Sequence, residues 1–164
     1  QLKKRFGPST NSNGLVPDRV ILALRKALCV SQTTYWGPYG VTQGGASRYE
    51  HGRPVPLQLQ ILISLHLTGV IGDKDLLNAS RAISRREKNR GRLTATLNLS
   101  RLADFRSGYG LSQNDFWGRL GLRQSSGSRY ERARNAMPYA SQALLWLVDT
   151  GRIEFDSITE MVSM

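Results

Sequence analysis

The sequence is poor in the residue types that build catalytic and metal sites. Its single cysteine, Cys29, excludes a disulfide within the chain, and its two histidines, His51 and His66, form no recognisable metal-ligand spacing with that thiol. No motif brings a nucleophile, a base and an orienting group together. The sequence therefore predicts a protein that is not an enzyme and that needs no metal or cofactor.

Long apolar runs are also missing. No run approaches the roughly 20 residues that a helix needs to cross a bilayer, and the first residues lack the charged, apolar and small-residue order of a signal peptide. These absences indicate a soluble, cytoplasmic protein.

Acidic residues are few beside basic ones. Twelve aspartates and glutamates stand against 23 lysines and arginines, which gives a formal net charge of +11. The excess lies in residues 1–134, whereas residues 135–164 are net negative. A strong basic excess is typical of proteins that bind a polyanion such as a nucleic acid.

What the sequence does contain is an internal repeat. The segment LRKALCVSQTTYWGPYGVTQGGASRYEHGR, from Leu24, aligns without a gap with FRSGYGLSQNDFWGRLGLRQSSGSRYERAR, from Phe105. One extra residue in the second copy extends the alignment as far as Ile71 and Ile153. Two copies are too few for a solenoid, so the repeat predicts two similar small domains in tandem.

Each copy has the pattern of an all-α domain with about four to five helices. Apolar residues recur at helical spacing at the start of each copy. Ser31 and Ser112 then occupy N-cap positions, and each opens a segment of about two turns that stops at Gly40 or Gly121. Another short helix and a longer apolar helix are expected beyond each glycine, and no strand pattern persists.

The predicted domain boundaries follow from these patterns. A basic flexible arm covers residues 1–16, the first domain covers 17–80, a basic linker covers 81–96 and the second domain covers 97–164. Lys3, Lys4 and Arg5 in the arm are expected to lie along a phosphate backbone or enter a groove. A tail with no binding role is the alternative.

Helix, glycine turn, helix is the skeleton of the helix-turn-helix motif, whose second helix enters the major groove of DNA while the first braces it. The segments VSQTTYWGPYGVTQGGASRYEHGR and LSQNDFWGRLGLRQSSGSRYERAR also resemble the Xre-like helix-turn-helix superfamily of lambda repressor and Cro. The resemblance rests on the Ser-Gln opening, the turn glycine, the apolar residue after it and the Ser-Arg-aromatic-Glu ending. It implies two tandem lambda-repressor-like domains with recognition helices at about 42–50 and 123–131.

The resemblance also implies which side chains meet DNA. Base readout falls on the outward positions of the recognition helices, namely Thr42, Gln43, Gly44, Ser47 and Arg48 in the first copy and Arg123, Gln124, Ser125, Ser128 and Arg129 in the second. Arginine can hold guanine with two hydrogen bonds, and glutamine can do the same for adenine. Phosphate contact falls on Gln32 and Gln113 at the start of the bracing helices, with Arg53 and Arg134 adding charge beside the backbone.

The chain departs from the family in the bracing helix, where a small residue normally stands one turn before the glycine. That place holds Trp36 and Trp117. Because protein interiors are packed to crystal-like density, an indole there requires smaller residues opposite, and the inward position of the recognition helix holds Ala46 in one copy and Gly127 in the other. We therefore predict that the glycines of the first recognition helix form a notch for Trp36, so that Gly45→Leu should unfold the first half. The alternative is that Gly44 and Gly45 merely fray the helix.

Two charge pairs are identical in both copies. Arg25 with Glu50, and Arg106 with Glu131, resemble the family's ion pair between the first and third helices. Both pairs are predicted to form. Their expected role is orientation more than net stability, because a partly buried pair gains little beyond its desolvation cost.

These features favour a sequence-specific binder of double-stranded DNA. We expect a nucleoid-associated transcription regulator, of repressor type and of bacterial or phage origin, with its two recognition helices in successive major grooves. The alternative is an antitoxin or adaptor that uses the same scaffold to bind a protein, with the acidic and apolar C-terminal segment as a docking or homodimerisation helix. That segment could equally be the last helix of the second core, and one copy could serve only as a scaffold.

Overall fold

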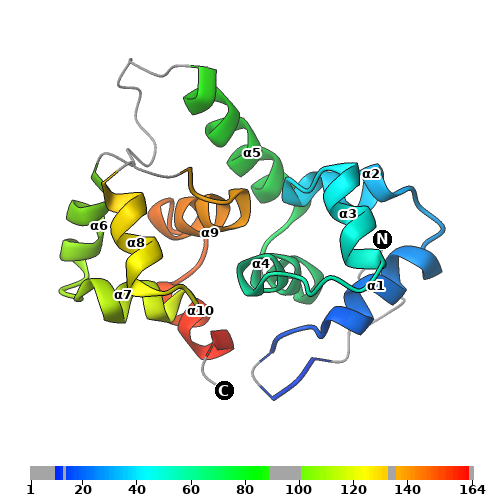
Figure 1. Ribbon diagram of the computed structural model, residues 1–164, viewed down its shortest axis with the longest axis horizontal. Helices are drawn as coiled ribbons and strands as arrows, with labels where there is room; N and C mark the ends of the chain where they lie inside the picture. The colour runs from blue at the N-terminus through cyan, green and yellow to red at the C-terminus, as the bar shows by residue number, and fades with distance from the viewer. Residues whose placement is uncertain (1–9, 13, 89–100, 133–135, 163–164) are drawn as a thin grey trace.

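The computed structural model describes residues 10–12, 14–88, 101–132 and 136–162, with the backbone alone for residues 85–88. Within these ranges the chain forms helices and turns and no strands (Figure 1). The predicted all-α class is therefore confirmed. None of the described helices is long and apolar enough to cross a membrane.

The first repeat runs from α1 to α5. Its helices are α1 (Asp18–Ala27), α2 (Gln32–Trp36), the 3-10 helix η2 (Gly37–Tyr39), α3 (Gln43–Glu50), α4 (Leu57–Thr68) and α5 (Asp73–Lys88). The bracing segment tightens from α2 into η2 at Pro38, which has no N–H to continue the α-helical hydrogen bonds.

The second repeat has the same order of elements. Its helices are α6 (Leu102–Gly108), α7 (Gln113–Arg119), α8 (Gln124–Glu131), α9 (Tyr139–Asp149) and α10 (Phe155–Val162). Arg119 stands where the first copy has Pro38, so α7 continues as one α-helix. The Arg119 guanidinium instead forms an ion pair with Asp156 of α10 at 3.3 Å.

The helix ends lie where the sequence places them. The side-chain oxygens of Ser31 and Ser112 accept hydrogen bonds from the backbone N–H of Thr34 and Asp115, at 3.1 and 3.2 Å. Gly40 and Gly121 follow the bracing segments with φ of +71° and +67°, a left-handed conformation that glycine adopts without steric cost. Each recognition helix begins three residues after its glycine.

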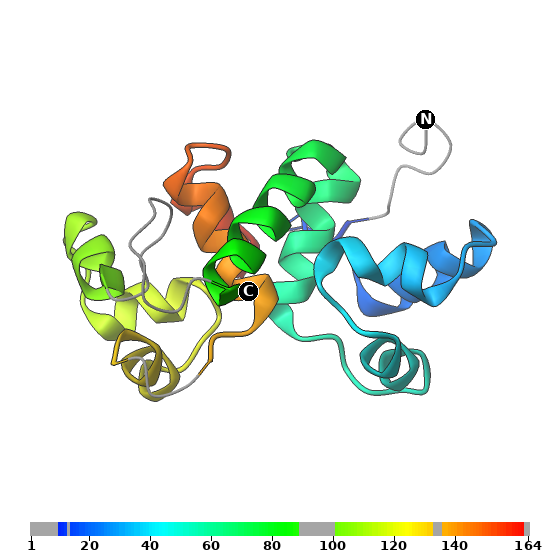
Figure 2. The same cartoon turned by 90° about the horizontal axis from the view of Figure 1, so that it is seen from above.

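The two repeats share one hydrophobic core, which the sequence analysis did not foresee. Helix α9 of the second repeat packs against both α4 and α5 of the first, and these three helices lie between the two halves of the molecule (Figure 2). Ile61, Leu65, Leu144 and Leu147 have no exposed surface. The apolar helices after Pro56 and Pro138 therefore close their own cores and also join the repeats.

Helix α5 extends further than the sequence analysis expected. It continues to Lys88, so residues 81–88, which we assigned to the start of the linker, are helical. Leu76, Ala79 and Ile83, at spacings of three and four, form its buried stripe. The rest of the predicted linker and the basic residues of the arm, Lys3, Lys4 and Arg5, lie outside the described residues.

The C-terminal segment belongs to the second core. Phe155 and Ile158 of α10 are buried, and the Phe155 ring stacks on Phe116 of α7 with centroids 5.0 Å apart and planes at 11°. The apolar face of α10 is thus already covered by its own domain. Of the roles considered for this segment, the last helix of the second core is the one observed.

Candidate nucleic-acid interface

Helices α3 and α8 lie on the same side of the molecule, at opposite ends of it. In Figure 2 both are seen close to end-on along the lower edge, with α4, α5 and α9 between the two halves. Both project beyond the helices behind them. The arrangement presents two short helices of eight residues each to one common side.

Each recognition helix has one buried and one exposed face. Ala46 and Gly127, at equivalent positions, are buried. The predicted base-contacting residues lie on the other faces: Thr42, Gln43, Gly44, Arg48, Arg123, Gln124, Ser125 and Arg129 are exposed, and Ser47 and Ser128 are partly exposed. The two N-caps differ. The Thr42 hydroxyl accepts a hydrogen bond from Gly45 N–H at 3.3 Å, whereas Arg123 makes no capping bond and leaves its side chain exposed.

The tryptophans are fully buried and the small inward residues Ala46 and Gly127 are buried too, but Gly44 and Gly45 do not form the notch that we predicted. A Cβ added to Gly127 would lie 2.0 Å from Cδ1 of Trp117, so in the second repeat the indole requires a glycine. In the first repeat a Cβ on Gly44 would meet nothing within 4 Å, and one on Gly45 would meet Val41 Cγ1 at 3.1 Å. The prediction that Gly44 and Gly45 accommodate Trp36 is therefore wrong, because these glycines do not face the indole.

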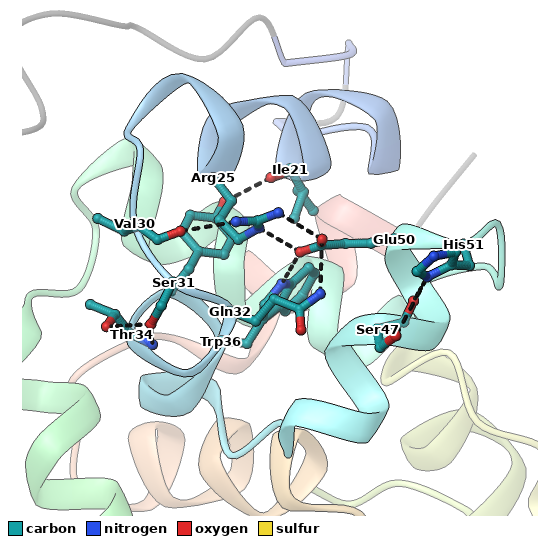
Figure 3. Close-up of polar contacts among 11 residues, drawn as sticks. Ile21, Arg25, Val30, Ser31, Gln32, Thr34, Trp36, Ser47, Glu50 and His51 are labelled. Carbon is teal, nitrogen blue, oxygen red and sulfur yellow. Dashed lines mark hydrogen bonds and ion pairs between the residues drawn. The ribbon is translucent and has the colours of Figure 1, made fainter.

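A glutamate at the end of each recognition helix accepts four hydrogen bonds, and Figure 3 shows those of Glu50 in the first repeat. Glu50 of α3 accepts two from Arg25 of α1, Nε to Oε1 at 2.5 Å and Nη2 to Oε2 at 2.7 Å. Gln32 Nε2 donates to Oε2 at 3.0 Å, and Trp36 Nε1 donates to Oε1 at 3.1 Å. Arg25 also donates to the carbonyl oxygen of Val30 at 2.9 Å. This cluster ties the recognition helix to both helices behind it.

The second repeat contains the same cluster. Arg106 donates to both carboxylate oxygens of Glu131, at 2.8 and 3.4 Å, and to the carbonyl oxygen of Leu111 at 2.7 Å. Gln113 Nε2 and Trp117 Nε1 donate to Glu131 at 2.8 and 2.9 Å. Both ion pairs expected from the sequence are therefore present. The tryptophan and glutamine bonds to the same carboxylate were not expected, although their identity in both copies was a signal that could have suggested them.

Hydrogen bonding lowers the pKa of both carboxyl groups. Burial alone would raise the pKa of Glu50, but the hydrogen bonds from Arg25, Gln32 and Trp36 outweigh it and lower the value from 4.5 to about 2. The pKa of Glu131 is lowered by the same balance, in which the bonds from Arg106, Gln113 and Trp117 overcome burial. Both glutamates are therefore ionised whenever the chain is folded near neutral pH.

Comparison with protein families gives this geometry a context. The chain matches the RsaL-like HTH domain twice, over residues 22–66 and 103–148, which together make up more than half of its length. It belongs to the RsaL-like HTH domain family. Each match runs from the first helix of a repeat into its long buried helix, so both RsaL-like domains include the bracing and recognition helices described above. No curated protein and no solved structure matches the chain.

The bracing glutamines of the RsaL-like domains are held in place by the glutamate clusters. One Nε2 hydrogen of Gln32 is used on Glu50, and one of Gln113 on Glu131. In the second domain the chain of bonds continues outward, because Gln124 Nε2 donates to Gln113 Oε1 at 2.8 Å. Contact of these glutamines with phosphate remains a prediction, and the structure adds that Gln113 orients Gln124 of the recognition helix.

Two further residues stand beside the recognition helices. Arg53, predicted to contact phosphate, is exposed just beyond α3, whereas its counterpart Arg134 lies outside the described residues. His51, which we did not single out, is exposed at the end of α3, and its Nδ1 lies 2.7 Å from the carbonyl oxygen of Ser47. A carbonyl only accepts, so Nδ1 carries the hydrogen and Nε2 points away from that bond. The alignment pairs His51 with Arg132, which is also exposed, and this correspondence was the signal in the sequence that could have drawn attention to His51.

Proposed function

We propose that this chain is a sequence-specific double-stranded DNA-binding transcription regulator that places α3 and α8 in successive major grooves. The RsaL-like HTH domains support the DNA-binding part, and the formal charge of +11 suits a polyanionic partner. The role is one of binding, with no chemical step. The finer resemblance to lambda repressor and Cro supports repressor-type recognition through the exposed faces of the two helices.

One observation carries the two-groove part of the proposal. Helices α3 and α8 project on the same side of the molecule (Figure 2), and in each the glutamate end is fixed by a partly buried cluster while the face opposite the core is exposed. Recognition helices of repressor dimers enter grooves about 34 Å apart on one face of the duplex. A chain whose two domains faced different sides could not bind in that way.

The residues that we assign to base edges follow from exposure and chemistry. Arg48 and Arg129 occupy equivalent exposed positions and can each hold a guanine with two hydrogen bonds. Gln43 and Gln124 can read adenine in the same manner. Arg123 adds a cation where the first repeat has Thr42, so the two half-sites should differ in sequence. Arg53 and Arg132 lie where they can neutralise phosphates.

Selection from random DNA duplexes tests the proposal. We expect an enriched site with two related but unequal halves, and an affinity that falls steeply with salt. Arg48→Ala should relax preference within one half-site and Arg129→Ala within the other, each at a cost of about 1–3 kcal/mol in binding. Lys74→Ala is the matched control, because it removes one exposed charge at the start of α5, on the side away from α3 and α8 (Figure 2). Equal binding to every sequence would refute specific recognition.

A further inference from the structure

The two repeats touch through equivalent residues. Tyr139, the first residue of α9, lies against Gly40, where an added Cβ would come within 2.3 Å of its ring carbons. Leu57, the first residue of α4, lies against Gly121 in the same way, with Cδ2 2.5 Å from an added Cβ. In the repeat alignment Gly40 corresponds to Gly121, and Leu57 to Tyr139. Each repeat thus contributes the same two elements to the contact, its turn glycine and the first residue of its long helix, as in the isologous interface of a two-fold dimer.

A buried amide fixes one side of this contact more firmly. Gln58, of which 9% is exposed, donates from Nε2 to the carbonyl oxygens of Leu120 at 2.9 Å and Gly121 at 3.0 Å. Its counterpart in the second repeat is Ala140, which has no amide to donate. A buried donor left without a partner is costly, so sliding of one repeat past the other would be opposed here.

The contact lies directly at the entry to the recognition helices. Gly40 stands two residues before Thr42, the N-cap of α3, and Gly121 stands two residues before Arg123, the N-cap of α8. Any side chain at either glycine would collide with the other repeat, and the positive φ of both already favours glycine. Movement at this contact would therefore move the start of a recognition helix.

Packing behind the contact restrains the two halves further. Helix α9 lies on α4 and α5, and Ala143, Leu144 and Leu147 on it have no exposed surface. At the edge, Arg152 Nε lies 3.6 Å from Asp75 Oδ1 of the first repeat. Interiors packed at this density deform little, so the two recognition helices are held as one body.

Resting on the function proposed above, we infer that the reciprocal contact of Gly40 with Tyr139 and of Gly121 with Leu57 sets the distance between the recognition helices and so makes one chain select DNA with a single half-site spacing. Leu57, Gln58 and Tyr139 are then positioning residues for spacing specificity, although they lie behind the helices that read bases. The partner is a duplex with two unequal half-sites on one face, bound by a single copy of the chain.

The test measures binding to duplexes in which the selected half-sites are kept and the spacer between them is changed one base pair at a time. An insertion of five base pairs turns one half-site by about half a helical turn, away from the face that the chain contacts. Wild type should bind this duplex about 100-fold more weakly than the selected one, because the second domain no longer adds to the first. Light scattering of the selected complex should give one chain per duplex.

Variants separate spacing from base reading. Tyr139→Ala, which uncovers Gly40, should reduce the 100-fold discrimination to less than about tenfold while the preferred half-site sequences stay the same. Tyr139→Phe keeps the ring on Gly40 and should retain the wild-type spacing profile. Gln58→Ala and Leu57→Ala provide the same test should Tyr139→Ala fail to fold, with circular dichroism as the check on folding.

The possible failures are distinct. Absence of any enriched sequence would contradict the proposed function itself. An enriched half-site that wild type binds equally well at every spacing, two chains on each selected duplex, or a folded Tyr139→Ala variant with the wild-type spacing profile would each overturn the spacing proposal and leave DNA binding intact.

Discussion

A single methyl group at Gly127 should destabilise the second repeat, although alanine is the better helix former. Gly127 lies inside α8, where replacing glycine by alanine ordinarily gains about 1 kcal/mol. The new Cβ, however, would lie 2.0 Å from Trp117 Cδ1 and 2.1 Å from Cγ. Carbon atoms in contact prefer about 3.5–4.0 Å, so the indole would have to move by more than 1 Å.

That movement has two costs. Forcing extra volume into a packed core costs about 1–3 kcal/mol. It also pulls Trp117 Nε1 from Glu131, now 2.9 Å away, and a hydrogen bond to a charged group contributes about 1.5–3 kcal/mol. After subtraction of the helix gain, Gly127→Ala should lower the free energy of unfolding by roughly 1.5–5 kcal/mol, a large part of the total for a domain of this size.

Urea unfolding followed by far-ultraviolet circular dichroism measures this effect, and Gly44→Ala is the matched control. Gly44 lies in the equivalent helix with nothing within 4 Å of an added Cβ, so that variant should gain up to about 1 kcal/mol. Combining Gly127→Ala with Trp117→Leu should cost less than the two single changes added together, because the smaller side chain relieves the collision. A Gly127→Ala variant as stable as wild type would refute the steric argument.

Three further changes test the fold and its charges. Cys29→Gly should raise the free energy of unfolding by about 0.5–1 kcal/mol, and the melting temperature with it, because Cys29 has φ of +53° where the second repeat has Gly110 at +65°. An unchanged or lower melting temperature would contradict this. Glu131→Gln should destabilise the second repeat by about 1–3 kcal/mol, since it leaves the partly buried Arg106 charge without its carboxylate partner, and a superimposable melting curve would count against the cluster. The folded-state pKa of Glu50 is depressed, so its contribution to stability is present above about pH 4.5 and is lost as the pH falls through about 2. Urea midpoints of wild type should therefore fall over this range more than those of Glu50→Gln, and parallel profiles would disprove the assignment.

The sequence predicted the parts of the fold that depend on local pattern. Helix period, serine N-caps and turn glycines are short-range signals, and they placed the helix-turn-helix elements of both repeats correctly. The Arg25–Glu50 and Arg106–Glu131 pairs could be foreseen because both copies carry them and because they resemble the ion pair of the Xre-like family. The base-contacting and phosphate-contacting assignments are predictions that still need DNA to test them.

Features that depend on the exact direction of a side chain were less accessible. Helical spacing placed Ala46 and Gly127 on the inward face correctly, but Gly44 and Gly45 precede Ala46 and a helix turns by about 100° at each residue, so these two glycines face away from the indole. The bracing segment of the first repeat was expected up to Gly40, but its 3-10 ending η2 was not, although Pro38 stands there in place of Arg119.

The contact between the repeats was missed for a different reason. Helix α4, LQLQILISLHLT, is apolar on nearly every side, and a helix of that kind must be covered all round. This pattern indicated that more than one repeat's core was needed to bury α4. The pattern could not show that α9 is the helix that covers α4, because the two helices are far apart in the sequence and no residue of either helix indicates which helix it packs against.

On the proposed function, joining two DNA-binding domains in one polypeptide changes how occupancy of the DNA site depends on protein concentration and how that site can evolve. When a repressor dimer is diluted, it dissociates both from its DNA site and into its two subunits, so the occupancy of the site falls for two reasons. Here the two domains are covalently joined and stay together at any concentration. A substitution in a homodimer alters both halves of an operator at once. On the same proposal, Thr42 and Arg123 can be substituted independently, so the sequence of one half-site can change while that of the other stays the same.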